Sequence, residues 1–299
     1  MKATLTYKVP DVLAEDSTES VWASIARGYE AFGSPLVPCH EDIEAIEGAV
    51  AKHAERTGAH PVRAVMLGVT PGLALMNWPR GARILGVEMS QAVINALWPG
   101  DIPGVRKAIC ASWFSLSAER EKYHVVVGDG SFSTCRFPGK VRDLVHAIRK
   151  LLVEDGMLAF RSYVRPHIQE TVDAVFDDLL GNKGLTVDCF KMRLYLAMQR
   201  TPQEGVALSE AARVLDRHGL DARIMQDSFG WSSAAVEPFV GWRNSRAIYS
   251  FPSVYELCDV LRECFDDVSV TYPGYELGHC CPTLVMRPWA SKKVVQQGI

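Results

Sequence analysis

The stretch Val62-Arg-Ala-Val-Met-Leu-Gly-Val-Thr-Pro-Gly72 decides the fold class. Its part from Arg63 to Leu67 is a short apolar run, as in a buried parallel strand, and it leads directly into a turn that contains glycine. Thr70 can cap a helix and Pro71 suits a first helical position, so a helix is expected next. A strand that passes through a tight turn into a helix predicts an α/β fold with a parallel sheet.

The segments after this stretch repeat the pattern of strand and helix. Apolar runs at 82–87, 107–111, 123–127 and 157–163 predict four further strands, and the spacing over 141–152 predicts a helix that Asp155-Gly156 ends. A helix at 253–264 and strands at 268–272 and 283–286 complete the series. Alternation of this kind predicts a Rossmann-like sheet with helices on both faces.

Two segments lie outside the alternation. Residues 15–56 predict two helices separated by the loop 33–38, and 164–248 predict helices at 170–180, 191–198 and 204–217 before a stretch rich in Gly, Ser and Trp. Trp231, Phe239 and Trp242 in that stretch suit either a small core of its own or a lid over a substrate. The chain is therefore expected to consist of three parts. Residues 1–60 form an N-terminal helical cover, residues 61–163 and 249–290 form a Rossmann-like domain, and residues 164–248 form a helical insertion that caps the substrate.

Composition excludes several classes of protein. The 299 residues are 48% hydrophobic and 22% charged, which is typical of a globular chain, and the net charge of −3 gives no support to nucleic-acid or anionic-lipid binding. No apolar run approaches the roughly 20 residues of a membrane span, and acidic residues between 11 and 19 argue against a signal peptide. None of the eight cysteines forms a Cys-x-x-Cys pair, so we expect reduced thiols, no metal site and a cytoplasmic protein.

Glu88 adds a second part to the predicted ligand site. It ends the strand at 82–87, where a carboxylate accepts hydrogen bonds from both ribose hydroxyls of an adenosyl ligand. Gly68 and Gly72 lack the Cβ that would obstruct a ligand, and the helix N-terminus between them attracts an anion. The turn and the acid together predict an adenosyl ligand at the carboxyl ends of the strands. An NAD-dependent dehydrogenase, the competing interpretation, would show a full Gly-x-Gly-x-x-Gly near the N-terminus.

With these motifs, the sequence from about Trp22 to Trp289 resembles the class I S-adenosylmethionine (SAM)-dependent methyltransferases of the small-molecule type. The resemblance rests on 64–72, 85–90, on 109–116 as the adenine segment, and on 123–132 and 151–160. It implies seven strands, the last antiparallel, and SAM as cofactor. The residues that it implies around SAM are Trp22, Tyr29, Pro38, Gly68, Thr70, Gly72, Glu88, Met89, Ser112, Trp113, Asp129 and Gly130. Met66, Thr70 and Ser112 depart from the family's pattern, because an acid, a glycine and an acid usually stand there.

Asp129 lies just beyond the predicted strand 123–127, and Arg161 and Tyr163 end the predicted strand 157–163; these three are the candidate catalytic residues. Asp129 could orient an acceptor or take its proton, although Asp-Gly is also a common turn. Arg161 and Tyr163 could bind an acceptor carboxylate or hydroxyl. Trp22 and Tyr29 either line the SAM pocket or attach the N-terminal helix to the sheet.

Three functions follow from these observations. The first is methyl transfer to a small molecule, as in specialised metabolism, with no nucleic-acid or membrane partner and with a homodimer kept open. The second is attack on another carbon of the sulfonium, by aminocarboxypropyl transfer or by cyclisation of SAM, which releases methylthioadenosine. The third is a non-catalytic SAM-binding protein.

Overall fold

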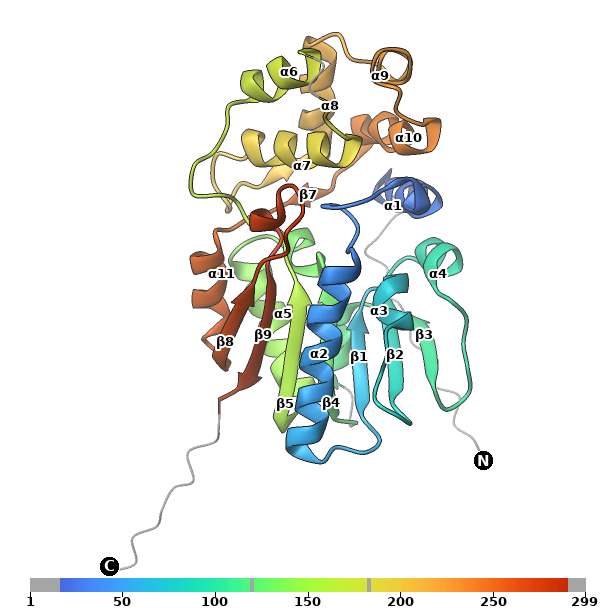
Figure 1. Ribbon diagram of the computed structural model, residues 1–299, viewed down its shortest axis with the longest axis vertical. Helices are drawn as coiled ribbons and strands as arrows, with labels where there is room; N and C mark the ends of the chain where they lie inside the picture. Colours follow the sequence, from blue (N-terminus) through green and yellow to red (C-terminus); the bar gives the residue numbers. More distant parts are fainter. Residues whose placement is uncertain (1–16, 119–120, 182–183, 290–299) are drawn as a thin grey trace, which may run out of the picture.

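A seven-stranded sheet forms the centre of the protein in the computed structural model, which describes residues 17–118, 121–181 and 184–289 (Figure 1). Residues 1–16 of the predicted cover and residue 290 of the predicted Rossmann-like domain lie outside these ranges. The strands run in the order β3-β2-β1-β4-β5-β9-β8. Their bounds are β1 Arg63–Leu67, β2 Arg83–Glu88, β3 Arg106–Cys110, β4 Tyr123–Asp129, β5 Leu152–Arg161, β8 Phe265–Thr271 and β9 Thr283–Pro288.

The first five strands pair in parallel, and β9 is antiparallel to both of its neighbours, β5 and β8. This confirms the predicted fold class, a mostly parallel sheet whose last strand is antiparallel. β1 lies at the reversal of the strand order, since β2 is on one side of it and β4 on the other. In sheets of this type the ligand site lies at the carboxyl ends of the strands at this reversal.

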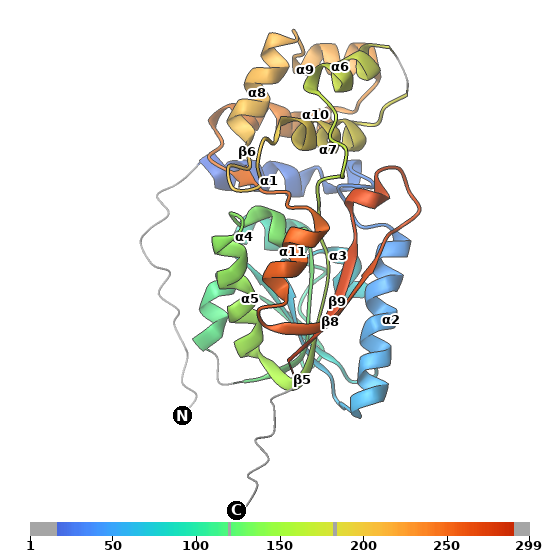
Figure 2. The ribbon, with the colours of Figure 1, turned by 90° about the vertical axis from the view of Figure 1, so that its left-hand side faces the viewer.

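Helices cover both faces of the sheet because its central strands are apolar on both sides. Along β1, Ala64 and Met66 pack toward α2 and α3, whereas Val65 and Leu67 pack toward α5 and α11, and all four are at most 1% exposed (Figure 2). The helices next to the sheet are α2 His40–Thr57, α3 Pro71–Leu75, α4 Gln91–Leu97, α5 Gly139–Leu151 and α11 Val254–Leu261. The short 3₁₀ helices are η1 Tyr29–Ala31, η2 Trp113–Ala118, η3 Ser131–Thr134, η4 Trp242–Asn244 and η5 Gly278–Cys280.

The segment between β5 and α11 forms a separate layer over the carboxyl ends of the parallel strands (Figures 1 and 2). It contains α6 Val172–Leu180, α7 Val187–Met198, α8 Leu208–Arg217, α9 Ala222–Phe229 and α10 Ser233–Gly241, and a two-stranded sheet of β6 Val206–Ala207 and β7 Ile248–Tyr249. Trp231, Phe239 and Trp242 belong to the apolar core of this layer, as one of the two interpretations of their sequence expects. Helix α1 (Ser17–Arg27) lies between this layer and α4.

Several predicted boundaries were wrong. The strand predicted at 157–163 is β5 Leu152–Arg161, and the helix predicted at 204–217 is α8 Leu208–Arg217, with β6 before it. Asp155-Gly156 does not end a helix, because α5 stops at Leu151 and β5 begins at once with Leu152 paired to Tyr123. The helix predicted at 191–198 begins earlier, at Val187, because the Thr186 side chain accepts a hydrogen bond from the Cys189 amide and caps it.

Candidate functional site

A cavity of about 500 Å³ lies where β1, β2 and β4 end, beneath α1 and the helical layer. The sheet contributes its strand ends and the turns that follow them to the lining, and the cover contributes α1 and the residues up to Val37. Helix α7 and β7 close the cavity from above. The residues from the sheet side that line it are Leu67, Gly68, Val69, Thr70, Glu88, Met89, Ser90, Val93, Leu97, Ser112, Trp113, Phe114, Asp129, Gly130, Ser131, Thr134, Cys135 and Tyr163.

The turn after β1 exposes backbone to this cavity. Gly68 has φ +95°, a left-handed conformation that favours glycine, and its amide donates to the Val87 carbonyl at 2.8 Å. Gly72, in contrast, is not part of the lining, because a Cβ there would lie 3.0 Å from Ile43 of α2. The predicted role of Gly72 next to a ligand is therefore corrected: this glycine lets α3 pack against α2.

Glu88 ends β2 with its carboxylate at the cavity wall. One carboxylate oxygen accepts the Ser90 amide at 2.9 Å, and the other lies 3.9 Å from the position that a Cβ of Gly68 would occupy. Met89, Ser112 and Trp113 continue this wall, and the Trp113 indole donates to the Val87 carbonyl at 2.7 Å. The acid at the end of β2 and the turn after β1 are thus adjacent, as the sequence predicts.

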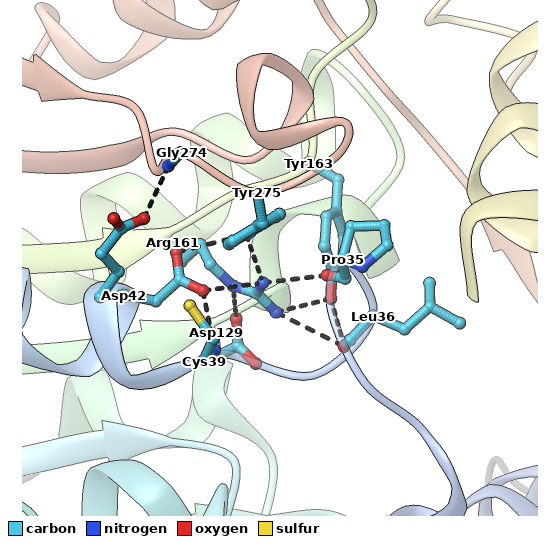
Figure 3. Close-up of polar contacts among 10 residues, drawn as sticks. Pro35, Leu36, Cys39, Asp42, Asp129, Arg161, Tyr163, Gly274 and Tyr275 are labelled. Atoms are coloured by element: carbon cyan, nitrogen blue, oxygen red, sulfur yellow. Dashed lines mark hydrogen bonds and ion pairs between the residues drawn. The ribbon is translucent and has the colours of Figure 1, made fainter. Parts of the chain in front are cut away.

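Arg161 is the centre of a buried polar network (Figure 3). Its side chain is 0% exposed, and its Nε donates to Asp129 at 2.5 Å. One terminal nitrogen donates to the Pro35 carbonyl at 2.9 Å and to the hydroxyl of Tyr275 at 3.1 Å, and lies 3.4 Å from Asp42. The other donates to the Tyr163 hydroxyl at 3.0 Å. All donor groups of the guanidinium therefore face protein acceptors.

This arrangement corrects the predicted role of Arg161 as a ligand for an acceptor. The guanidinium lies behind Asp129 and Tyr163 and is not among the residues that line the cavity. The Tyr163 hydroxyl in turn donates to the Leu36 carbonyl at 2.7 Å, so the network attaches the cover segment 35–42 to β5. Pro38, predicted to contact SAM, belongs to this segment and lies outside the lining.

The charges in the network are coupled. Burial raises the pKa of Asp129, and the adjacent Arg161 acts in the opposite direction. Burial lowers the pKa of Arg161, but Asp129, Tyr163 and Tyr275 together act more strongly in the opposite direction and raise that pKa well above its usual value. Asp129 and Tyr163 both reach the cavity wall, while their polar atoms bind Arg161.

The part of the cavity under the helical layer is apolar and aromatic. Trp22 and Tyr29 lie there, as one interpretation of the sequence expects, and the ring of Trp22 meets that of Tyr249 edge-on at 6.2 Å. Sequence analysis missed the residues that join them, because these come from segments far apart in the chain and carry no motif. The missed residues are Ile25, Phe32, Leu36, Met192, Tyr195, Ile248, Tyr249 and Phe251.

Lys191 of α7 is a buried cation behind this aromatic wall. It is 3% exposed, and its Nζ lies 4.0 Å from the ring centre of Phe32 and 4.7 Å from that of Phe239. Its only hydrogen bond in the described residues goes to the Ala235 carbonyl at 3.4 Å. Burial lowers the pKa of the amine from 10.5 to about 7, although Asp188 partly offsets this.

We expect Lys191→Met to be more stable than the wild type near pH 7, with an advantage that shrinks toward pH 10. Over this interval the unfolded chain holds the lysine proton and the folded chain does not, because the folded pKa is about 7. The free energy of unfolding of the wild type therefore rises with pH, by up to about 1.4 kcal/mol per pH unit, and approaches that of the variant. Urea unfolding at a series of pH values measures the difference. Lys52→Met, on an exposed lysine, is the matched control, and a difference independent of pH would contradict the expectation.

Among the residues that the structure describes, no group of three His, Cys, Asp or Glu side chains is placed to hold a metal ion. Nor does that part of the chain contain a helix both long and apolar enough to span a membrane.

Comparisons with known proteins complete the description. No protein-family model matches the sequence, and no curated protein is similar to it in sequence. Among solved structures, the chain is similar to a Rhodobacter sphaeroides protein described as a Zn-dependent alcohol dehydrogenase, at a TM-score of 0.51 and 15% identity over 93% of this chain and 100% of that one. It is also similar to the N-methyltransferase NodS from Bradyrhizobium japonicum WM9 in complex with S-adenosyl-L-homocysteine (SAH). The TM-score is 0.48 and the sequence identity 10%, over 91% of this chain and 98% of that one. A third similar structure is the DhpI–SAH complex, with a TM-score of 0.47 and 14% identity over 91% of this chain and 95% of that one.

Identities this low bear on the fold alone. The sheet itself has the seven strands and the antiparallel last strand that the motif resemblance implies. The chain therefore has a Rossmann-like fold with a mostly parallel seven-stranded sheet.

Proposed function

We propose that this protein is a SAM-dependent methyltransferase that methylates a small molecule, as in specialised metabolism. The observation that carries the proposal is one continuous cavity with two different ends. One end is polar, at Gly68, Glu88 and Ser112, and the other is the aromatic space under the helical layer. A donor and an acceptor bound in one cavity can react without crossing water.

The polar end fits an adenosyl group. The glycine at position 68 leaves the backbone after β1 accessible, and the Glu88 carboxylate at the end of β2 suits two ribose hydroxyls. Met89, Ser112 and Trp113 lie beside them as a wall for the base. The volume of about 500 Å³ is within the range of small-molecule sites. The neighbours crystallised with SAH, the product of methyl transfer from SAM, agree with this assignment.

When bound, SAM supplies a methyl group on a positively charged sulfur. The residues of this chain then have to exclude water and align the acceptor with that methyl group. The cover segment suits this role, because the Arg161 network holds Pro35 and Leu36 on the sheet. No histidine is part of the described lining, and the Asp129 carboxylate is paired with Arg161. Positioning, rather than proton transfer by the protein, is therefore the contribution that we assign to the site.

Product analysis tests the proposal. The protein is incubated with SAM labelled in its methyl group and the low-molecular-weight fraction of a source-cell extract, and the products are identified by mass spectrometry. We expect SAH and one small molecule that carries the label. Methylthioadenosine in place of SAH would show attack on another carbon of the sulfonium. Binding of SAH in calorimetry with no product in any fraction would show a non-catalytic binding protein. The cytoplasmic location and the homodimer stay predictions.

A further inference from the structure

The aromatic end of the cavity, which we call the acceptor chamber, is built from four segments. Its members are Trp22, Tyr29, Phe32, Tyr195, Tyr249 and Phe251. Tyr195 of α7 packs against the rings of Tyr249 in β7 and of Phe251 just after it. Its ring centre lies 5.6 Å from that of Tyr249 and 6.2 Å from that of Phe251. These residues leave a space between flat apolar surfaces, which suits a ring system.

The two phenols that the helical layer contributes to the chamber, Tyr195 and Tyr249, have no hydrogen-bond partner in the described residues, and neither has Tyr29 of the cover. Tyr195 is only 7% exposed, yet no hydrogen bond of its hydroxyl to the protein is present, and the same holds for Tyr249. Tyr163 and Tyr275, in contrast, both bind Arg161 through their hydroxyls. Burial raises the pKa of Tyr195 and of Tyr249, so both phenols keep their protons at neutral pH. Neither hydroxyl oxygen is among the fully buried atoms that lack a partner, so both are open to the cavity that these residues line, where a ligand can supply one.

The charges around the chamber disfavour an anion. No lysine, arginine or histidine lines the described cavity, and its two acids are Glu88 and Asp129. A carboxylate or phosphate would enter an apolar space without a counter-charge.

A cation is disfavoured by the basic groups behind the walls. The Lys191 amine lies 4.0 Å from the ring centre of Phe32, a residue of the chamber. The guanidinium of Arg161 lies over the ring of Tyr163 at 5.2 Å and neutralises Asp129. The ring of Phe32 and the carboxylate of Asp129, two groups that would attract an ammonium ion, therefore already face a basic group of the protein.

We infer that the acceptor is an uncharged, ring-bearing molecule, and that the phenols of Tyr195 and Tyr249 bind its hydroxyl or carbonyl oxygen. The position of the acceptor beside a methyl donor rests on the proposed function. The preference for an uncharged ring rests on the chamber itself.

Binding of naphthalene derivatives tests this inference. Titration calorimetry at neutral pH, with and without saturating SAH, compares 2-naphthol with the anion 2-naphthoate and the cation 2-naphthylmethylammonium. We expect 2-naphthol to bind at least about tenfold more tightly than either ion, because an ion in the chamber lacks compensation. Equal or tighter binding of either ion, or no binding of 2-naphthol, would overturn the inference.

Two variants locate the hydrogen bonds. Tyr195→Phe and Tyr249→Phe are each expected to weaken 2-naphthol binding about 2- to 12-fold, the effect of one hydrogen bond, and to leave the affinity for naphthalene unchanged. Tyr255→Phe, on an exposed tyrosine of α11, is the control. Unchanged 2-naphthol affinity in both variants would refute the assignment of the phenols. If SAH does not bind while 2-naphthol shows this pattern, the proposed function fails and the inference stands; if SAH binds and the pattern is absent, the inference alone fails.

Discussion

Arg161→Met is expected to lower the free energy of unfolding by about 3–5 kcal/mol, the largest effect that we predict for one substitution. The variant leaves the Asp129 carboxylate, whose side chain is 9% exposed, and the fully buried Asp42 without their shared cation. It also removes the donors to Pro35 and to the Tyr275 hydroxyl. Urea unfolding followed by circular dichroism at neutral pH measures the loss.

Arg165→Met is the matched control for this experiment. Arg165 pairs with Glu256 at 3.0 Å, but the two side chains are 30% and 33% exposed. A pair open to solvent contributes little, so we expect a loss of less than about 1 kcal/mol. An Arg161→Met protein as stable as the wild type but unable to methylate would contradict a structural role and restore Arg161 as an acceptor ligand.

Glu88→Ala is expected to weaken SAH binding by about 1–3 kcal/mol, or roughly 5- to 150-fold, because it removes the carboxylate assigned to the ribose hydroxyls. Titration calorimetry gives the affinity. The same carboxylate accepts the Ser90 amide at 2.9 Å, so thermal unfolding is measured in parallel. Glu88→Gln keeps one acceptor oxygen and is expected to fall between the wild type and Glu88→Ala.

Glu154→Ala controls for the loss of a negative charge. Glu154 is exposed in the first half of β5, before the strand reaches the end at Arg161 that meets the cavity wall. We expect its SAH affinity to equal that of the wild type. If Glu88→Ala bound SAH as tightly as Glu154→Ala, the ribose assignment would be refuted.

The geometry of the site explains why its polar end could be predicted from sequence more readily than its aromatic end. Gly68 and Glu88 each follow directly on a strand, and parallel strands bring their carboxyl ends to one edge. Their proximity therefore follows from the fold class. Tyr195 and Tyr249 come together only because α7 and β7 pack inside the helical layer, and nothing near either residue in the sequence indicates the other.

The same distinction applies to Arg161. The sequence shows a cation at a strand end, and a strand end can present it to a ligand or to the protein. The outcome depends on Asp42, 119 residues away, and on the carbonyls of the cover segment. Those groups accept the hydrogen bonds of the guanidinium, so Arg161 forms an ion pair inside the protein and does not face a substrate.

The sequence by itself determined the α/β class and the approximate positions of the strands along the chain, although β5 begins at Leu152 and not at Met157. Arg63–Leu67 forms β1 as predicted, because a short apolar run between turn residues is a local property of the chain. Tertiary structure alone decided the use of Gly72, the burial of Arg161 and the composition of the acceptor chamber. Each of these depends on contacts between residues distant in the chain, which local periodicity and capping do not encode.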